Sequence, residues 1–125
     1  MQDRFKFRYH FDNKIWDVSE IDFDNQTLEL KVDAFEAIHI KDFKYENLVQ
    51  CTGLKDKNGK LIFEGDICIY DFEEIGKQKA VIYFNNTYAG FMVKPLRNFQ
   101  CTNLNNCEII GNIYENQELL EVKGE

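Results

Sequence analysis

The sequence has little proline and no long apolar run. Pro95 is the single proline among 125 residues, and no stretch is rich in serine, glycine or proline. A flexible linker between two folding units has such a composition, so we expect one compact unit. A membrane helix needs about 20 apolar residues, and no run approaches that length. The first residues also lack the apolar segment of a signal peptide, and we therefore expect a cytoplasmic protein that does not enter a membrane.

Positive charge is also scarce. Lys and Arg together number 15 against 22 for Asp and Glu, which gives a net charge of -7 and a pI near 4.9. Proteins that bind duplex DNA or anionic lipid present a cationic surface to that polyanion. The charge balance therefore argues against duplex DNA or anionic lipid as the main partner.

The sequence contains no recognisable catalytic or metal-binding motif. The four cysteines form no C-x-x-C pair, and Cys101 and Cys107 have no nearby thiol or histidine to complete a zinc site. His10 and His39 lie outside any nucleophile motif, and the acidic residues of segment 71–74 are typical of a solvated hairpin loop. We therefore expect reduced, metal-free thiols, no cofactor and no enzymatic activity.

Strand-like alternation dominates the pattern of apolar residues. From Arg4 to Phe11 every second residue is aromatic, which predicts a strand with one buried aromatic face. The segment 12–32 predicts short antiparallel strands separated by turns rich in Asp and Asn, and Asp12-Asn13 supply the first of these turns. One short helix is expected within residues 33–50, and a last helical turn is expected within residues 115–122.

The region after residue 50 has the layout of a small barrel. The pair Asn58-Gly59 predicts a tight turn, and further glycines stand where a curled sheet bends. Small barrels remove exposed strand edges by curling the sheet on itself. The strand-like segments that follow the turn are residues 67–70, 80–84, 91–93 and 108–114.

We therefore predict a mainly β fold with an SH3-like barrel in its C-terminal part, over residues Thr52–Tyr114. Residues 1–50 form an N-terminal strand region that packs on this barrel, and residues 51–125 form the barrel and a tail. Segments 67–70 and 80–84 are expected to be neighbouring antiparallel strands.

Three segments carry a more specific pattern. The central one, Val49–Ile67, reads VQCTGLKDKNGKLIFEGDI, and the pieces Lys6–Arg8 (KFR) and Ile109–Asn116 (IIGNIYEN) flank it in order. Together they closely resemble the YopX-like family of bacteriophage and prophage proteins. The chain departs from the family pattern where Tyr9–Asp12 replaces a usual Trp-Asp pair and where Gln117 replaces a proline.

This resemblance implies a mainly β protein with an SH3-like C-terminal part, encoded by a phage or prophage, whose biochemical role is unassigned. The resemblance implies no catalytic residue in this chain. We interpret the signature residues as scaffold, since glycine and Asn-Gly permit turns and an aspartate can accept backbone N–H bonds. A ligand site along the loop Thr52–Asp66 is the alternative. The signature residues are Thr52, Gly53, Asn58, Gly59, Gly65, Asp66, Gly111 and Asn112.

The leading interpretation is a non-enzymatic interaction module that binds a host or phage protein. Small barrels commonly gather aromatic residues near hairpin ends into a binding surface. The alternative is a nucleic-acid-associated module in phage DNA metabolism, in which basic side chains and stacking aromatics hold a single strand. Mimicry of DNA by the acidic surface is a third hypothesis. The candidate aromatic surface is Tyr70, Phe72, Tyr88 and Phe91, and the candidate basic stripe is Arg4, Lys6 and Arg8.

Short edge strands and exposed aromatic residues also predict self-association. A net charge of -7 on a chain of this size does not prevent pairing between apolar patches. We therefore expect a homo-oligomer whose contact uses Phe5–Phe11 or Glu115–Val122.

Overall fold

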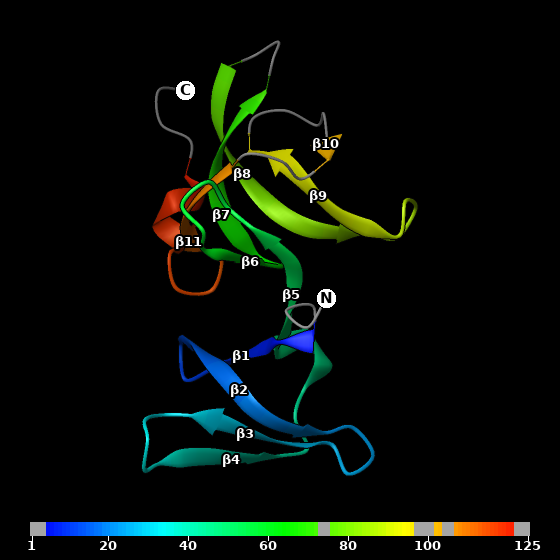
Figure 1. The fold of residues 1–125 in the computed structure, drawn as a ribbon, viewed down its shortest axis with the longest axis vertical. Coiled ribbons are helices and arrows are strands. Elements are labelled where there is room, and N and C mark those ends of the chain that lie inside the picture. The colour runs from blue at the N-terminus through cyan, green and yellow to red at the C-terminus, as the bar shows by residue number, and fades with distance from the viewer. Residues whose placement is uncertain (1–4, 73–75, 97–101, 104–106, 122–125) are drawn as a thin grey trace.

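Two antiparallel β-sheets make up the described part of the chain, which is residues 5–72, 76–96, 102–103 and 107–121 of the computed structural model (Figure 1). Within these residues, helical structure is limited to short 3₁₀ turns. The turn η2 spans Tyr45–Asn47 and the turn η3 spans Gln117–Leu120. The prediction of a mainly β fold is confirmed, and η3 is the last helical turn that the sequence led us to expect.

The first sheet has six strands and the second has five. The strands of the first sheet are β1 (Phe7–Phe11), β2 (Lys14–Asp22), β3 (Thr27–Lys31), β4 (Ala37–Lys41), β5 (Leu48–Lys55) and β6 (Leu61–Phe63). Those of the second sheet are β7 (Asp66–Phe72), β8 (Gly76–Asn85), β9 (Gly90–Pro95), β10 (Thr102–Asn103) and β11 (Cys107–Asn112). The spatial orders are β4-β3-β2-β1-β5-β6 and β10-β9-β8-β7-β11.

Short turns set the hairpins of the first sheet. Asp12 and Asn13 connect β1 to β2 with φ angles of 54° and 62°, which is the left-handed conformation that a two-residue hairpin turn requires. Between β2 and β3, the Asp22 carboxylate accepts hydrogen bonds from the backbone N–H groups of Asp24 and Asn25 at 3.0 and 3.1 Å. The meander predicted from the Asp- and Asn-rich segments is therefore present.

The short helix expected within residues 33–50 is reduced to the single turn η2. The Asp33 carboxylate accepts hydrogen bonds from the backbone N–H groups of Phe35 and Glu36 at 2.7 and 2.8 Å. These bonds stabilise a tight turn between β3 and β4, because an aspartate side chain competes with the helical hydrogen-bond pattern.

Only the middle of the β1 aromatic face is buried, so the prediction of a fully buried face is wrong. The strand begins at Phe7, and Tyr9 is 3% exposed whereas Phe5 and Phe11 are 71% and 38% exposed. Tyr9 packs against the fully buried Phe43, with ring centroids 6.3 Å apart. The core of this sheet gathers around that pair, and the two ends of the aromatic row lie outside it.

The second sheet is open. As predicted, β7 and β8 are antiparallel neighbours, with Ile67 opposite Val81. The chain then adds β9 and β10 on one side, while β11 returns to the other edge of β7. The described part of β10 is two residues long and pairs with β9 alone. The expected closed barrel over Thr52–Tyr114 is therefore wrong, because the two outer strands β10 and β11 do not pair.

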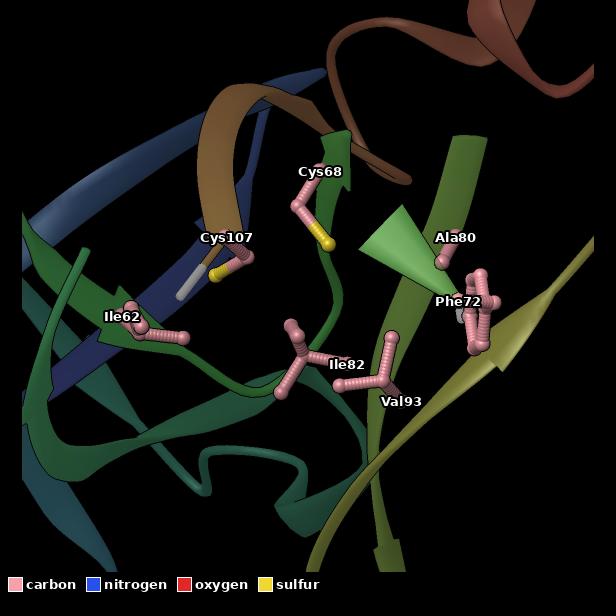
Figure 2. Close-up of a cluster of buried hydrophobic side chains, with 7 residues drawn as sticks. All are labelled: Ile62, Cys68, Phe72, Ala80, Ile82, Val93 and Cys107. Atoms are coloured by element: carbon pink, nitrogen blue, oxygen red, sulfur yellow. The ribbon is translucent and has the colours of Figure 1, made fainter. Parts of the chain in front are cut away.

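The first sheet continues beyond residue 50, through β5 and β6, and the chain passes to the second sheet at Glu64-Gly65. The two sheets share apolar core. Ile62 of β6 is 2% exposed and packs with buried side chains of the second sheet, as Figure 2 shows. The other buried members of that cluster are Cys68, Phe72, Ala80, Ile82, Val93 and Cys107.

A buried carboxylate fastens the β5–β6 turn to β11. Asp56 is 6% exposed, and its Oδ1 accepts hydrogen bonds from the backbone N–H groups of Asn58 and Lys60, both at 2.9 Å. Its Oδ2 accepts a third bond, at 3.0 Å, from the backbone N–H of Ile109. Burial alone raises the pKa of Asp56, but these three donors outweigh burial and hold it below its ordinary value. The charged carboxylate therefore links the two sheets.

The segment after β11 makes a second connection, to the β1–β2 hairpin. The Glu115 carboxylate accepts a hydrogen bond from the backbone N–H of Ile15 at 3.0 Å. The neighbouring Tyr114 places its ring 4.9 Å from the His10 ring. Residues that are 100 positions apart in the chain are thus held together, and the two sheets are joined at a second point.

Replacement of Asp56 by alanine tests the first connection. Asp56→Ala removes the acceptor of three backbone N–H groups and is expected to lower the free energy of unfolding by about 2–4 kcal/mol. Urea denaturation measures this loss. Asp22→Ala is the matched control, because Asp22 also accepts two turn N–H bonds but is exposed and joins no second sheet. Equal losses in the two variants would contradict a special role for Asp56.

Candidate functional site

A groove of about 290 Å³ lies where the two sheets meet. One wall comes from η2 and the start of β5 in the first sheet, and the other comes from β8 and the segment after β11. The connection between β6 and β7 lies between these walls. Ligand sites are common where separate structural layers adjoin. The groove is lined by three tyrosines, Tyr45, Tyr83 and Tyr114, and by two carboxylates, Glu46 and Glu64.

Tyr114 is positioned by contact with a glycine. The backbone N–H of Ile113 donates to the carbonyl of Gly65 at 2.9 Å, and the Tyr114 ring then lies against this glycine. A Cβ atom at position 65 would lie 2.9 Å from Cε2 of Tyr114, and the backbone there has a φ of +86°. Both facts require glycine. Gly65 thus brings the first sheet, the second sheet and Tyr114 to one point.

The signature pair Gly111-Asn112 shapes the turn that carries Tyr114. The Asn112 side-chain oxygen accepts hydrogen bonds from the backbone N–H groups of Tyr114 and Glu115 at 3.0 and 2.8 Å. The Asn116 side-chain oxygen accepts the N–H of Asn112 and approaches Gly111 so closely that a Cβ there would lie 2.6 Å away. These contacts support the interpretation of Gly111 and Asn112 as scaffold residues of the groove.

The other signature residues lie in turns and in an irregular part of β5. Gly53, with a φ of +85°, lies where the β5–β6 register shifts, and the preceding Thr52 is 6% exposed and accepts the Leu54 N–H at 3.1 Å. Asn58 and Gly59 form the turn enclosed by the Asp56 carboxylate. Each of these positions has a backbone role.

Burial raises the pKa of three ionisable groups near the groove. Asp66 is 4% exposed, and burial raises its pKa to about 6 although it accepts the Phe63 N–H at 2.8 Å and lies near Arg8. Burial also raises the pKa of Glu64. The pKa of Tyr114 is raised by burial and by the charges of Glu64 and Asp66. The ionised forms of all three groups are therefore disfavoured relative to exposed groups.

The candidate basic stripe is not a row of available cations. Arg8 donates from Nε to Asp17 at 3.1 Å, and its guanidinium lies 3.9 Å from the ring centroid of Phe63. Lys6 is exposed, and Arg4 lies outside the described residues. His10 belongs to the same face, but its Nε2 is buried and has no hydrogen-bond partner within the described part of the chain. Arg8, the last residue of the stripe, is thus already engaged within the protein.

The four aromatic candidates do not form one surface. Phe72 is 7% exposed and lies in the core, and Tyr70 packs against it with ring centroids 4.6 Å apart. Tyr88 is 74% exposed in the β8–β9 turn, whereas Phe91 contacts Phe84 of the neighbouring strand. Tyr45 and Tyr83 of the groove were not singled out from the sequence. They come from distant segments and belong to no common motif.

The remaining chemical groups stay separate. Cys51, Cys68 and Cys107 are free and buried, while Cys101 and the acidic pair Glu73-Glu74 lie outside the described residues. A hydrogen bond with Cys107 and burial raise the pKa of the Cys68 thiol. In the described residues no three His, Cys, Asp or Glu side chains are placed to hold a metal ion. No helix among them is long and apolar enough to cross a membrane.

Asp66 is expected to make stability fall as the pH rises from about 4 to about 6. Its folded-state pKa of about 6 exceeds its ordinary value of 3.8, so the folded protein binds more protons than the unfolded chain within this window. Asp66→Asn removes this titration. As the pH rises from about 4 to about 6, the free energy of unfolding of the variant should rise by on the order of 3 kcal/mol relative to that of the wild type. Above pH 7 the difference between the two proteins should change little.

Urea denaturation at pH 4, 5, 6 and 7 measures this difference. Asp71→Asn, at an exposed position of the same strand, is the matched control and should follow the wild type. If the free energies of unfolding of the wild type and Asp66→Asn changed in parallel with pH, Asp66 would not be the cause of the fall in stability.

Comparison with known proteins completes the description of the site. The family model described as YopX protein matches residues 6–121. Among solved structures, the chain is similar to the crystal structure of protein EF1440 from Enterococcus faecalis, with 26% sequence identity and a TM-score of 0.56. That similarity covers 93% of this chain and 97% of the other. Curated proteins gave no significant match. Because the family match includes every strand and both walls of the groove, the chain belongs to the YopX protein family.

Proposed function

We propose that this protein is a non-enzymatic interaction module, encoded by a phage or prophage, that binds a host or phage protein in the bacterial cytoplasm through the groove between its sheets. The observation that carries the proposal is the meeting of three tyrosines from three distant segments at one groove. Tyrosine combines a large apolar ring with a polar hydroxyl and is enriched where proteins bind one another.

The rigidity of the groove supports this proposal. The Asp56 and Glu115 hydrogen bonds join the sheets at two points, so the two walls are fixed before a partner arrives. Binding to a preformed surface avoids the entropy cost of ordering that surface.

The strand order supports an SH3-like origin for the second sheet. Strands β7, β8 and β9 form a meander, and β11 returns to the free edge of β7. This order agrees with the proposal of an SH3-like second sheet that has not closed into a barrel. SH3 domains bind extended peptides in aromatic-lined grooves, which agrees with the proposed role.

The nucleic-acid alternative has less support. Arg8 is engaged by Asp17 and Phe63, and the net charge of -7 repels a polyanion.

Self-association stays a prediction, as does its contact through Phe5–Phe11 or Glu115–Val122, and a third location can be proposed beside these two. The strand β1 pairs on both edges, with β2 and β5, so Phe5–Phe11 offers no free strand edge. The C-terminal segment is held by Lys79, whose ammonium donates to the carbonyl of Leu119 at 3.1 Å. We propose the edge of β4, which pairs with β3 alone among the described strands, as the contact. Light scattering that returned a monomer mass of 14.8 kDa at every concentration would contradict self-association.

Truncation of one groove tyrosine tests the proposed function. Tyr45 is 57% exposed, so Tyr45→Ala should fold normally and weaken partner binding at least tenfold. Affinity capture from host lysate, with mass spectrometry to identify the partner and calorimetry on the purified pair, gives the measurement. The matched control is Tyr88→Ala, because Tyr88 is 74% exposed in the β8–β9 turn and is not among the described residues that line the groove. Equal binding by the two variants would contradict the groove as the binding site.

A further inference from the structure

We propose that the groove between the sheets recognises a cationic side chain, lysine or arginine, within a segment of the partner protein. This inference rests on the proposed function and adds the chemistry of the partner. It predicts that a basic residue inserts between the tyrosine rings, with its charge directed at the groove carboxylates.

The charge of the groove is the first argument. Glu46 contributes a carboxylate from η2 and Glu64 contributes one from the connection between β6 and β7, and no Lys, Arg or His is among the described residues that line the groove. Glu64 is half-buried, so its charge is less screened by water than that of an exposed carboxylate. The groove therefore complements a positive charge.

The wall behind the groove adds to this negative field. Asp66 is 4% exposed and lies close enough to Tyr114 for its charge to act on the tyrosine hydroxyl, as does that of Glu64. The positive charges of Arg8 and Lys60 lower the pKa of Asp66 and so oppose this negative field. Arg8 lines an adjoining depression that shares Glu64 and Tyr114 with the groove. It is paired with Asp17, and it is not among the described residues that line the groove.

The apolar part of the groove fits the stem of a basic side chain. Leu48, Val81 and Ile113 line it together with the tyrosine rings. Lysine and arginine bury their methylene stems on such surfaces while the charged head contacts polar groups. A cation within about 6 Å of a tyrosine ring centroid also gains from the ring quadrupole. One amphipathic side chain thus satisfies both kinds of lining.

Another depression of the protein lacks this combination. A hollow of about 390 Å³ on β2, β3 and β4 is lined by Glu20, Asp22 and Glu29, but also by His39 and Lys41. There Lys41 supplies a cation within the protein, and Nδ1 of His39 lies 3.7 Å from Oε2 of Glu29. Among the described residues, no Phe, Tyr or Trp lines that hollow. The selectivity for a cation is therefore a property of the groove between the sheets.

Small blocked amino acids test the inference directly. The probes are N-acetyl-lysine N-methylamide, the corresponding arginine compound and the norleucine compound, which keeps the stem and lacks the charge. In NMR titrations of the full chain, the two cationic probes should shift the backbone amides of Glu64, Gly65 and Tyr114 at millimolar concentration. Norleucine should bind at least fivefold more weakly, and added salt should weaken the cationic probes alone.

The Glu64→Gln variant should bind the cationic probes at least fivefold more weakly than the wild type and leave norleucine binding unchanged. Asp71→Asn, which removes one carboxylate at an exposed position outside the groove, is the matched control and should match the wild type. Because the groove lining is otherwise kept, unchanged amide chemical shifts outside the groove verify that the Glu64→Gln variant is folded.

Two results would overturn the inference. Norleucine binding equal to lysine binding would leave a peptide-binding groove without a preference for charge. Absence of any shift at the groove amides, with partner capture still dependent on Tyr45, would show that the groove binds its partner by other chemistry. The proposed function itself fails only if partner capture does not depend on Tyr45, so the two failures are distinguishable.

Discussion

The Asp56 carboxylate, buried in the β5–β6 turn, carries the connection on which the rest of the structure depends. It accepts two N–H bonds from its own turn and one from Ile109 of the other sheet. A buried charge is costly unless several donors compensate it, and here those donors come from both sheets. The same residue therefore closes a local turn and fixes where β11 lies, and the segment that carries Tyr114 follows directly from β11.

The junction of the two sheets explains why glycine or asparagine stands at several signature positions. Gly65 allows Tyr114 to approach the β6–β7 connection, and Gly111 allows Asn116 to approach β11. Asn112 then holds the turn that presents Tyr114 and Glu115. These positions lie far apart in the chain, yet all of them serve the junction of the sheets. The tyrosines and carboxylates of the groove depend on that junction for their placement.

Local patterns predicted the strands well but predicted the site poorly. The pairing of β7 with β8 followed from alternation and a short connection, and the hairpin at Asp12-Asn13 followed from turn chemistry. Closure of the barrel depends on contact between two outer strands, which no local pattern encodes. The burial of Phe72 and the exposure of Phe11 depend equally on which elements cover them. Tyr45 and Tyr83 meet only through the arrangement of both sheets.

The central claim is that the two sheets form one cooperative unit with a fixed groove between them, and native-state hydrogen exchange measures it most directly. The informative amides are Ile109, which donates to Asp56, and Ile15, which donates to Glu115. The account predicts that both exchange only through global unfolding, with the same free energy of opening as buried residues of each sheet, such as Leu30 and Ile82. Exchange of Leu30 and Ile82 with clearly different opening free energies, and earlier exchange of Ile109 and Ile15, would contradict it.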